Sequence, residues 1–307
     1  MIVVAGEALI DLVVMPGATT IRSAIGGGPF NTARAAARLG ASATFLGVLS
    51  RDRFGIALVD ALRADTVDDS MVQFSDMPTT LAVAEVDDDG AATYRFYSAA
   101  TASPALEVVP LPAATSILHV GTLGLVLEPM AIAIESLVCA ADESVIVMVD
   151  ANCRPQAIAD RESYVRRFWR IVDRADVIKV SADDLDYLFA DEQDAGVQRM
   201  IDAGVRLVLE TNGGHAVRVH GLSDRIDVPV PDVDVVDTIG AGDSFGGAFA
   251  AWWDQASLNA KDLSDADTVT AAVRAAVEVA AINCTRPGAD SAWYAELGDR
   301  WHPAVRP

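Results

Sequence analysis

Apolar runs alternate with amphipathic stretches along most of the chain, which is the pattern of an α/β protein. The first run, IVVAGEALIDLVV, is typical of a central strand; the helical stretches GGGPFNTARAAARLGA and RFGIALVDALRAD follow, separated by the strand-like SATFLGVLS. Four further buried-type runs come later, SILHVG, SVIVMVDAN, ADVIKVS and VRLVLETNG, with helical segments such as RESYVRRFWRIVDR between them. This order predicts a parallel sheet covered on both faces, with ligands at the carboxyl ends of its strands. Residues 240–283 are predicted to be mainly helical.

The alternation breaks at about residues 78–98. There TTLAVAEV, the turn DDDG and AATYRFYS predict a β-hairpin instead of another strand-helix unit. Together with outlying strands predicted at about residues 12–25, the hairpin is a candidate lid over the ligand site. We expect the sheet and the lid to form a single domain over residues 1–307. The alternating apolar residues of the hairpin are also consistent with a homodimer formed through the lid.

Composition and charge restrict the class of protein. Of 307 residues, 51% are hydrophobic and 22% are charged, as in globular proteins. The formal net charge is -21, from acidic residues spread along the chain, and this charge argues against a nucleic-acid partner. No apolar run reaches the roughly 20 residues of a membrane helix, and the N-terminal segment is unlike a signal peptide. Cys139, Cys153 and Cys284 are widely spaced, as expected of reduced core thiols in a cytoplasmic protein.

The stretch DTIGAGDSFGGAF, residues 237–249, is the candidate anion site. Neither a P-loop motif nor a dinucleotide glycine motif after the first strand offers an alternative. Its glycines let the amides of Gly240, Ala241 and Gly242 converge at the start of a helix, which predicts an anion hole. Two interpretations of Asp243 remain open here: a carboxylate that caps the helix, or a base that faces the same site as the anion.

Five segments, in a fixed order, resemble the motifs of the ribokinase-like (PfkB) carbohydrate kinase family: GEALIDL, IGGGPFNTARAAARLG, DANCRP, DTIGAGDSFGGAFAAW and CTRPGA. They span nearly the whole chain, and they are most similar to the fructokinase and 2-keto-3-deoxygluconate kinase branch. The resemblance implies a three-layer α/β sandwich with a mostly parallel central sheet and a small β lid. It also implies ATP-dependent phosphorylation of a hydroxyl group of a small sugar, as in a fructokinase.

The same resemblance assigns roles to single residues. Asp243 would take the proton of the sugar hydroxyl while the amides of residues 240–242 hold the charge of the transferred group, which suits a reaction that depends on positioning and charge stabilisation. The residues expected to bind the sugar are Asp11, Gly27, Gly28, Asn31 and Arg154, and Tyr94 or Tyr97 is a candidate for packing on it. The residues expected to bind ATP are Thr211, Gly213, Gly214 and Asn283.

Mg²⁺ and a monovalent cation such as K⁺ are further cofactors that the resemblance implies. The family's Asn-x-x-Glu segment, associated with magnesium, falls on Ser181 to Asp184. Asp184 is therefore expected to reach Mg²⁺ through water, and its alternative is a role as an acid at a helix N-terminus. The monovalent cation is expected at Asp237, Thr238 and Gly288.

Substrate choice stays open in the sequence. Arg154 keeps 2-keto-3-deoxygluconate kinase as an alternative, whereas Ser98 stands where many acid-sugar kinases have an arginine and disfavours a carboxylate-bearing sugar. A nucleoside kinase is a more distant alternative. A non-catalytic sugar-binding regulator on the same fold belongs to another class, but it would be expected to lack the base or the glycine-rich anion hole, and both are present.

Overall fold

The main feature of the fold is an eight-stranded sheet in the order β14-β13-β12-β11-β10-β9-β1-β4. We describe residues 1–17, 19–87, 92–223 and 225–303 of a computed structural model. Neighbouring strands are parallel from β12 to β4, as predicted, whereas β13 and β14 pair antiparallel at one edge and were not predicted. The strands are β1 (Ile2–Ala5), β4 (Ala43–Leu46), β9 (Ile117–Gly121), β10 (Ile146–Asp150), β11 (Val177–Ser181), β12 (Leu207–Thr211), β13 (Val217–His220) and β14 (Ile226–Val228).

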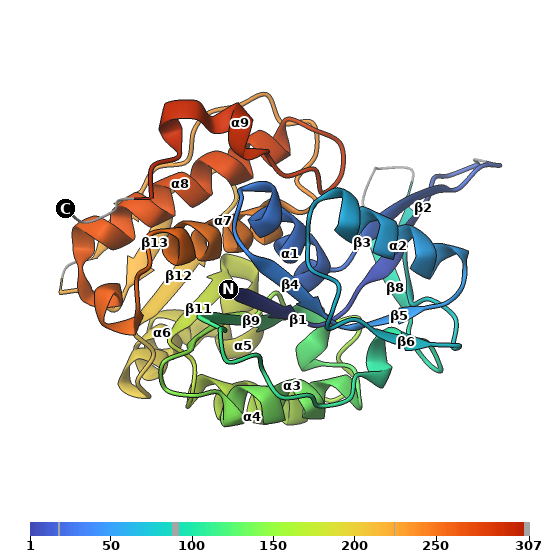
Figure 1. The fold of residues 1–307 in the computed structure, drawn as a ribbon, viewed down its shortest axis with the longest axis horizontal. Coiled ribbons are helices and arrows are strands. Elements are labelled where there is room, and N and C mark those ends of the chain that lie inside the picture. Colours follow the sequence, from blue (N-terminus) through green and yellow to red (C-terminus); the bar gives the residue numbers. More distant parts are fainter. Residues whose placement is uncertain (18, 88–91, 224, 304–307) are drawn as a thin grey trace.

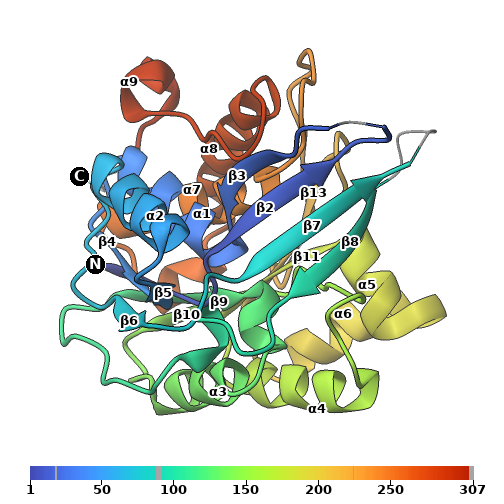
Figure 2. The ribbon, with the colours of Figure 1, turned by 90° about the vertical axis from the view of Figure 1, so that its right-hand side faces the viewer.

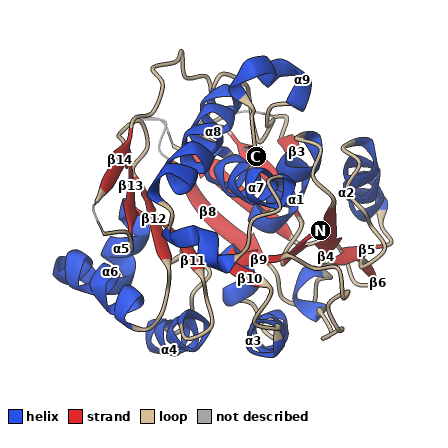
Figure 3. Cartoon of the chain, turned by 60° about the vertical axis from the view of Figure 1, so that its left-hand side comes forward, coloured by secondary structure: helices blue, strands red, loops and turns tan. Residues whose placement is uncertain are grey.

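Helices cover both faces of this sheet and make the predicted three-layer sandwich (Figures 1 and 3). One face carries α1 (Gly28–Arg38), α2 (Arg53–Ala64), α7 (Ala241–Gln255) and α8 (Ala266–Cys284). The other face carries α3 (Met130–Ala140), α4 (Arg161–Val172), α5 (Ala182–Phe189) and α6 (Gln193–Asp202). The short α9 (Tyr294–Leu297) follows near the end of the described chain. Two covering layers are needed because the parallel strands are apolar on both faces.

A second, smaller sheet stands beside the main one, with its strands in the order β3-β2-β7-β8 (Figure 2). Its strands are β2 (Leu9–Val14), β3 (Arg22–Gly26), β7 (Leu81–Val86) and β8 (Ala92–Tyr97). It contains both segments from which a lid was predicted, residues 12–25 and 78–98. Residue 18 and residues 88–91, on which most of the predicted turn DDDG falls, lie outside the described residues. We call it the small sheet; its role as a lid stays a prediction.

Two apolar runs that were predicted as single strands are each divided between two sheets. IVVAGEALIDLVV forms β1 in the main sheet and β2 in the small sheet, because the chain bends at Gly6, whose φ is 152°. SATFLGVLS forms β4 and then β5 (Val48–Ser50), which pairs with β6 (Gln73–Ser75). Asp11 therefore lies in the middle of β2 in the small sheet, although the run that contains it was predicted to be a central strand.

Two further expectations concern the surface and the core. Among the described residues, no helix is both long enough and apolar enough to cross a membrane. The three cysteines are free thiols, but Cys139 is exposed on α3, so the expectation of a core thiol is wrong for this residue. Cys153 is buried and Cys284 is half-buried.

Candidate active site

A cavity of about 610 Å³ lies between the carboxyl ends of the main strands and the inner face of the small sheet. We call it the first cavity. Its lining includes all the residues that were expected to bind the sugar, Asp11, Gly27, Gly28, Asn31 and Arg154, together with Gly240, Gly242 and Asp243. The fold thus brings residues from widely separated segments to one place, at the edge of the sheet where ligands of such folds bind.

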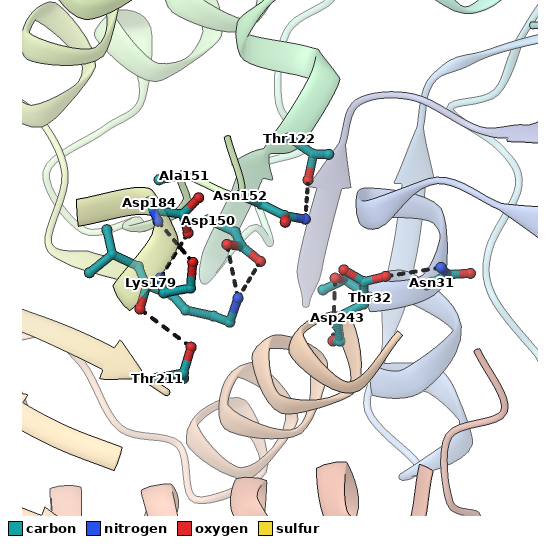
Figure 4. A network of polar contacts seen from close by, with 12 residues as sticks. Asn31, Thr32, Thr122, Asp150, Ala151, Asn152, Lys179, Asp184, Thr211 and Asp243 are labelled. Carbon is teal, nitrogen blue, oxygen red and sulfur yellow. Dashed lines mark hydrogen bonds and ion pairs between the residues drawn. The ribbon is translucent and has the colours of Figure 1, made fainter. Parts of the chain in front are cut away.

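Asp243 lies in the first turn of α7, and 8% of the residue is exposed. α7 begins after Gly240, which has a left-handed φ of 77°, and no side chain of the described residues caps the helix by a hydrogen bond. The Asp243 carboxylate instead accepts a hydrogen bond of 2.9 Å from Nδ2 of Asn31 (Figure 4). Asp243 therefore makes no capping hydrogen bond within the described chain, and the residue lines the first cavity.

Asn31 reaches Asp243 because α1 and α7 pack very closely. A Cβ atom at Gly247 of α7 would lie 2.6 Å from the carbonyl oxygen of Thr32 and 2.8 Å from Cβ of Ala35. Thr32 also donates from Oγ1 to the Asp243 carbonyl oxygen at 3.3 Å. Oδ1 of Asn31 has no partner within the described part of the chain, so it is available to accept a hydrogen bond from a ligand hydroxyl.

Burial raises the pKa of Asp243 to about 6, while the hydrogen bond from Asn31 and the positive charge of Lys179 oppose this rise. Lys179 is buried, and its Nζ lies 3.0 and 2.9 Å from the two carboxylate oxygens of Asp150 (Figure 4). Burial alone would lower the pKa of Lys179, but the paired Asp150 raises it, so the ammonium stays charged. A Cβ atom at Gly242 would lie 3.0 Å from this Nζ, which puts a positive charge beside the start of α7.

The three backbone amides of the predicted anion hole differ in their hydrogen bonds. The N–H groups of Gly240 and Gly242 have no acceptor among the described residues. The N–H of Ala241 differs from the expectation, because it donates to the Thr238 carbonyl at 3.2 Å in the turn that precedes α7. Two of the three expected amides are therefore available to an anion, with Lys179 close behind them.

A second cavity, of about 540 Å³, adjoins the first and shares Thr238 and Gly242 with it. The expected ATP-binding residues Thr211, Gly213 and Gly214 line it. The remaining walls are largely apolar and include Val217, Val230, Val235, Phe245, Val277 and Ala281. A mostly apolar slot that opens onto free backbone amides suits a flat base with a phosphate chain attached.

Asn283 does not line this second cavity, contrary to the expectation that it binds ATP. The residue has no exposed surface. Its Nδ2 donates to the Ile239 carbonyl at 2.8 Å, and its Oδ1 accepts from Oγ of Ser244 at 3.1 Å. Asn283 thus ties α8 to the loop before α7, and Cys284, Ala280 and Ala281 line the cavity in its place.

Comparison with known proteins decides the family. The family model described as pfkB family carbohydrate kinase matches residues 1–295. The chain belongs to this family. The kinase is 34% identical over 254 residues to the fructokinase of Rhizobium leguminosarum bv. trifolii, a match that covers 80% of this chain and 77% of that relative.

Solved structures agree with this assignment. A fructokinase with bound ATP from Xylella fastidiosa has a TM-score of 0.87 and 29% identity, covering 94% of this chain and 93% of that one. A double mutant of the fructokinase from Vibrio cholerae O395, in its fructose, ADP and potassium ion bound form, has a TM-score of 0.82 and 26% identity, covering 94% and 93%. The predicted ribokinase-like fold and fructokinase-like activity as an ATP-using sugar kinase are confirmed. The alternative activity on 2-keto-3-deoxygluconate gains no support from these relatives.

In the kinase, Asp184 is buried at the N-terminus of α5. Its Oδ1 accepts from the N–H of Cys153 at 2.6 Å and its Oδ2 from the N–H of Ser181 at 2.7 Å. Since its own N–H donates to Oγ of Ser181, Asp184 forms a capping box, in agreement with the alternative role as an acid at a helix N-terminus. In the part of the chain that the structure describes, no group of three or more His, Cys, Asp or Glu side chains is placed to hold a metal ion. Asp184 also lines the first cavity, so a contact with Mg²⁺ through water stays a prediction.

The residues expected at a monovalent cation lie together beside the start of α7. Asp237 accepts from the N–H of Gly288 at 2.8 Å and from the N–H of Ile239 at 3.0 Å. Thr238 lines both cavities. These contacts hold the loop that carries the anion hole, while the cation itself stays a prediction.

On the sugar side of the site, the carboxyl group of Asp11 and the guanidinium group of Arg154 come from different segments of the chain. Burial raises the pKa of Asp11 to about 6, and the positive charge of Arg154 opposes this rise. Arg154 is the one basic side chain among the described residues that line the first cavity. Of the two candidate aromatic residues, Tyr94 lines the cavity, whereas Tyr97 does not and is 55% exposed.

Several residues that lie in or beside the site were not predicted from the sequence, namely Glu7, Thr122, Asp150, Asn152 and Lys179. The buried Glu7 accepts from the N–H groups of Gly28 and Gly124, each at 3.1 Å, and burial raises its pKa to about 8. The sequence contained a signal for Glu7 and Lys179, since these two charged residues interrupt the apolar runs VVAGEALI and ADVIKVS. Charged residues in buried runs are rare unless they have partners or a function.

Proposed function

We propose that the kinase transfers the γ-phosphoryl group of ATP to a hydroxyl of fructose or of a closely similar neutral sugar. The observation that carries the proposal is the position of Asp243. Its carboxylate is fixed by Asn31 at the floor of the first cavity, one residue after Gly242, which lines both cavities. The names of the fructokinases to which the chain is similar support fructose as the substrate.

In the proposed reaction, the sugar lies in the first cavity and ATP lies in the second. The sugar hydroxyl oxygen forms a bond to the γ-phosphorus as the bond from that phosphorus to the ADP oxygen breaks, and the hydroxyl proton passes to Asp243. With a pKa of about 6, Asp243 is mostly ionised near neutral pH and is able to accept this proton. The N–H groups of Gly240 and Gly242 and the charge on Lys179 stabilise the transferred group.

The metal cofactors remain part of the proposal. Mg²⁺ prefers oxygen ligands and keeps several waters, so ATP oxygens would supply its direct ligands and Asp184 would contact a bound water. When bound, Mg²⁺ would neutralise phosphate charge. A K⁺ ion would fit the carboxylate and carbonyl oxygens of the loop at Asp237, Thr238 and Gly288 and would rigidify the anion hole.

The charges of the first cavity favour a neutral sugar over an acidic one. Glu7 is mostly protonated near neutral pH because its pKa is about 8. The other acidic lining residues are Asp11, Asp183, Asp184 and Asp243, against the single base Arg154 among the described residues. The small sheet lines the cavity mainly with apolar side chains, which offer a carboxylate no partner, and its polar lining residues are Asp11 and Tyr94. A substrate carboxylate would therefore meet mainly negative charge.

A substrate panel tests the proposal. The protein is incubated with ATP and Mg²⁺ and with fructose, ribose, 2-keto-3-deoxygluconate or inosine, and ADP release is measured. We expect the highest kcat/KM for fructose. Turnover of the keto acid alone would overturn the choice of substrate, and faster turnover of inosine than of any free sugar would indicate a nucleoside kinase. Sugar binding without turnover of any compound would indicate a non-catalytic regulator.

Assembly and location complete the proposal. Met15 and Ile21, in or beside β2 and β3, are 41% and 58% exposed, and Tyr97 on β8 is also exposed. These apolar side chains support a homodimer through the small sheet, which light scattering would detect as a doubled mass. The use of ATP supports the cytoplasmic location expected from the sequence.

A further inference from the structure

Two residues of the first cavity have a backbone conformation that is unusual for their type. Thr122 has a φ of 53° and Asn152 has a φ of 35°. Thr122 directly follows β9 and Asn152 lies two residues after β10, and these strands are parallel neighbours, so both residues lie at one edge of the sheet. The left-handed region is tolerated by asparagine but is a genuine outlier for the β-branched threonine. Such a conformation persists only where the surroundings hold it, and it is concentrated at functional sites.

The two side chains are joined by a hydrogen bond. Nδ2 of Asn152 donates to Oγ1 of Thr122 at 3.0 Å (Figure 4). A threonine hydroxyl donates one hydrogen bond and accepts up to two. Because Asn152 supplies the proton of this bond, the hydroxyl proton of Thr122 must point elsewhere. Within the described ranges of the chain, no protein acceptor receives it, although only 6% of Thr122 is exposed.

The free side of the Thr122 hydroxyl lies beside the base. A Cβ atom at Gly28 would lie 2.4 Å from Oγ1 of Thr122 and 3.4 Å from Oδ1 of Asp243. The two side-chain oxygens therefore border the same small space, which only a glycine at position 28 leaves open. Thr122, Gly28 and Asp243 all line the first cavity, so this space is accessible to a ligand.

We propose that Thr122 contacts the substrate, donating a hydrogen bond from its hydroxyl to the oxygen of the sugar hydroxyl that is phosphorylated. Asn152 is a positioning residue that fixes the direction of this donor. The reacting hydroxyl then gives its proton to Asp243 and accepts from Thr122, so that its remaining lone pair forms the bond to the γ-phosphorus as the bond to ADP breaks. Thr122 keeps its own proton throughout. This inference rests on the proposed function, because it requires that the sugar enters the first cavity and that its hydroxyl is phosphorylated there.

The hydroxyl is tested with Thr122→Val, Thr122→Ser and Thr122→Gly. Removal of one donor from an oxyanion hole lowers rates by about 100-fold or more, and we expect a loss of kcat/KM for the sugar of about this order in the valine and glycine variants. KM for ATP should stay unchanged, and serine should restore kcat/KM to within about fivefold of the parent protein. The glycine variant also separates an effect on catalysis from an effect on folding. Because glycine adopts a positive φ freely, this variant should unfold at a temperature no lower than that of the parent protein.

The role of Asn152 is tested with Asn152→Ala, alone and combined with Thr122→Val. We expect the single change to lower kcat/KM about tenfold and to add no further loss to the valine variant, because it acts only through the hydroxyl. If the fall in kcat/KM of the double variant equalled the product of the two single falls, Asn152 would act independently of the Thr122 hydroxyl, and the positioning role would be overturned. A kcat/KM for Thr122→Val or Thr122→Gly equal to that of the parent would overturn the contact itself. If the parent turned over no sugar, the proposed function would fail, which is a separate result.

Discussion

Nδ2 of Asn31 on α1 lies 2.9 Å from Oδ2 of Asp243 on α7, and this hydrogen bond is buried. The contact joins two motifs that are far apart in the chain, the glycine-rich start of α1 and the glycine-rich start of α7. It holds the Asp243 carboxylate toward the first cavity and away from the amides of its own helix. A carboxylate held this way is able to serve as a general base.

The ionisation of Asp243 should control the acid side of the pH profile. Because its pKa is raised to about 6, the carboxylate becomes protonated as the pH falls below that value and no longer accepts a proton. We expect kcat/KM for the sugar to fall about tenfold for each pH unit below about 6. Asp11, with a similar pKa, should add to this loss through weaker sugar binding. A profile that stays flat down to about pH 4, where an ordinary carboxylate titrates, would contradict this expectation.

Substitutions of the buried partners Lys179 and Asp150 should shift the acid limb of the pH profile, the fall in kcat/KM at low pH, in opposite directions. Lys179 lowers the pKa of Asp243 and Asp150 raises it. We therefore expect the acid limb to move to higher pH in Lys179→Met and to lower pH in Asp150→Asn. Removing one partner of a buried pair destabilises a protein by roughly 3–5 kcal/mol, so folding of each variant is checked by circular dichroism. Shifts in the same direction for both variants would show that the pair does not act on Asp243 through its charges.

Stability of Asp243→Asn should depend on pH in a defined direction. The pKa of Asp243 is raised from 3.8 to about 6, so the folded protein binds this proton more tightly than the unfolded chain does. The ionised carboxylate therefore lowers stability, fully above about pH 6 and not at all below about pH 4. An asparagine avoids this effect, and we expect the variant to be more stable than the parent at pH 8 by on the order of 3 kcal/mol at most, with no gain at low pH.

Thermal unfolding at several pH values measures this difference. The exposed Asp60 on α2 provides a matched control, and Asp60→Asn should change the unfolding temperature little at any pH. A gain for Asp243→Asn that grew as the pH fell would mean that the sign of the pKa shift is wrong.

Gly28 should tolerate no side chain, because a Cβ atom would lie 2.4 Å from Oγ1 of Thr122. We expect Gly28→Ala to lower kcat/KM for the sugar by about 100-fold while KM for ATP stays near that of the parent. Gly124→Ala is the control, since the nearest atom to a Cβ there is 3.5 Å away, at an ordinary contact distance. Equal effects of the two changes on sugar kinetics would argue against close packing of substrate at Gly28.

The order of elements was predictable because strands buried on both faces leave continuous apolar runs, as in ADVIKVS for β11. The division of the first run between β1 and β2 was not, because two strands buried in different sheets give the same pattern as one long strand. The antiparallel β13 was also missed, although VRVH alternates as an edge strand does.

The candidate site was predictable where a residue acts through its own local pattern, and less so where it acts through distant partners. Gly240, Gly242 and Asp243 follow from one motif. Asn283 contacts Ile239 and Ser244, which are far from it along the chain, so the local sequence around Asn283 does not predict these contacts. Lys179 and Asp150 meet only because β10 and β11 are paired, and the strain at Thr122 exists only in the folded backbone.

The central claim is that Asp243 is the base of a sugar kinase, and turnover of Asp243→Asn with fructose and ATP tests it most directly. Binding of each ligand to the variant is followed by calorimetry, so that loss of chemistry is separated from loss of binding. We expect both ligands to bind while kcat falls by about 10³-fold or more, as for the loss of a positioned base. A kcat within about tenfold of the parent, with normal binding, would contradict the account.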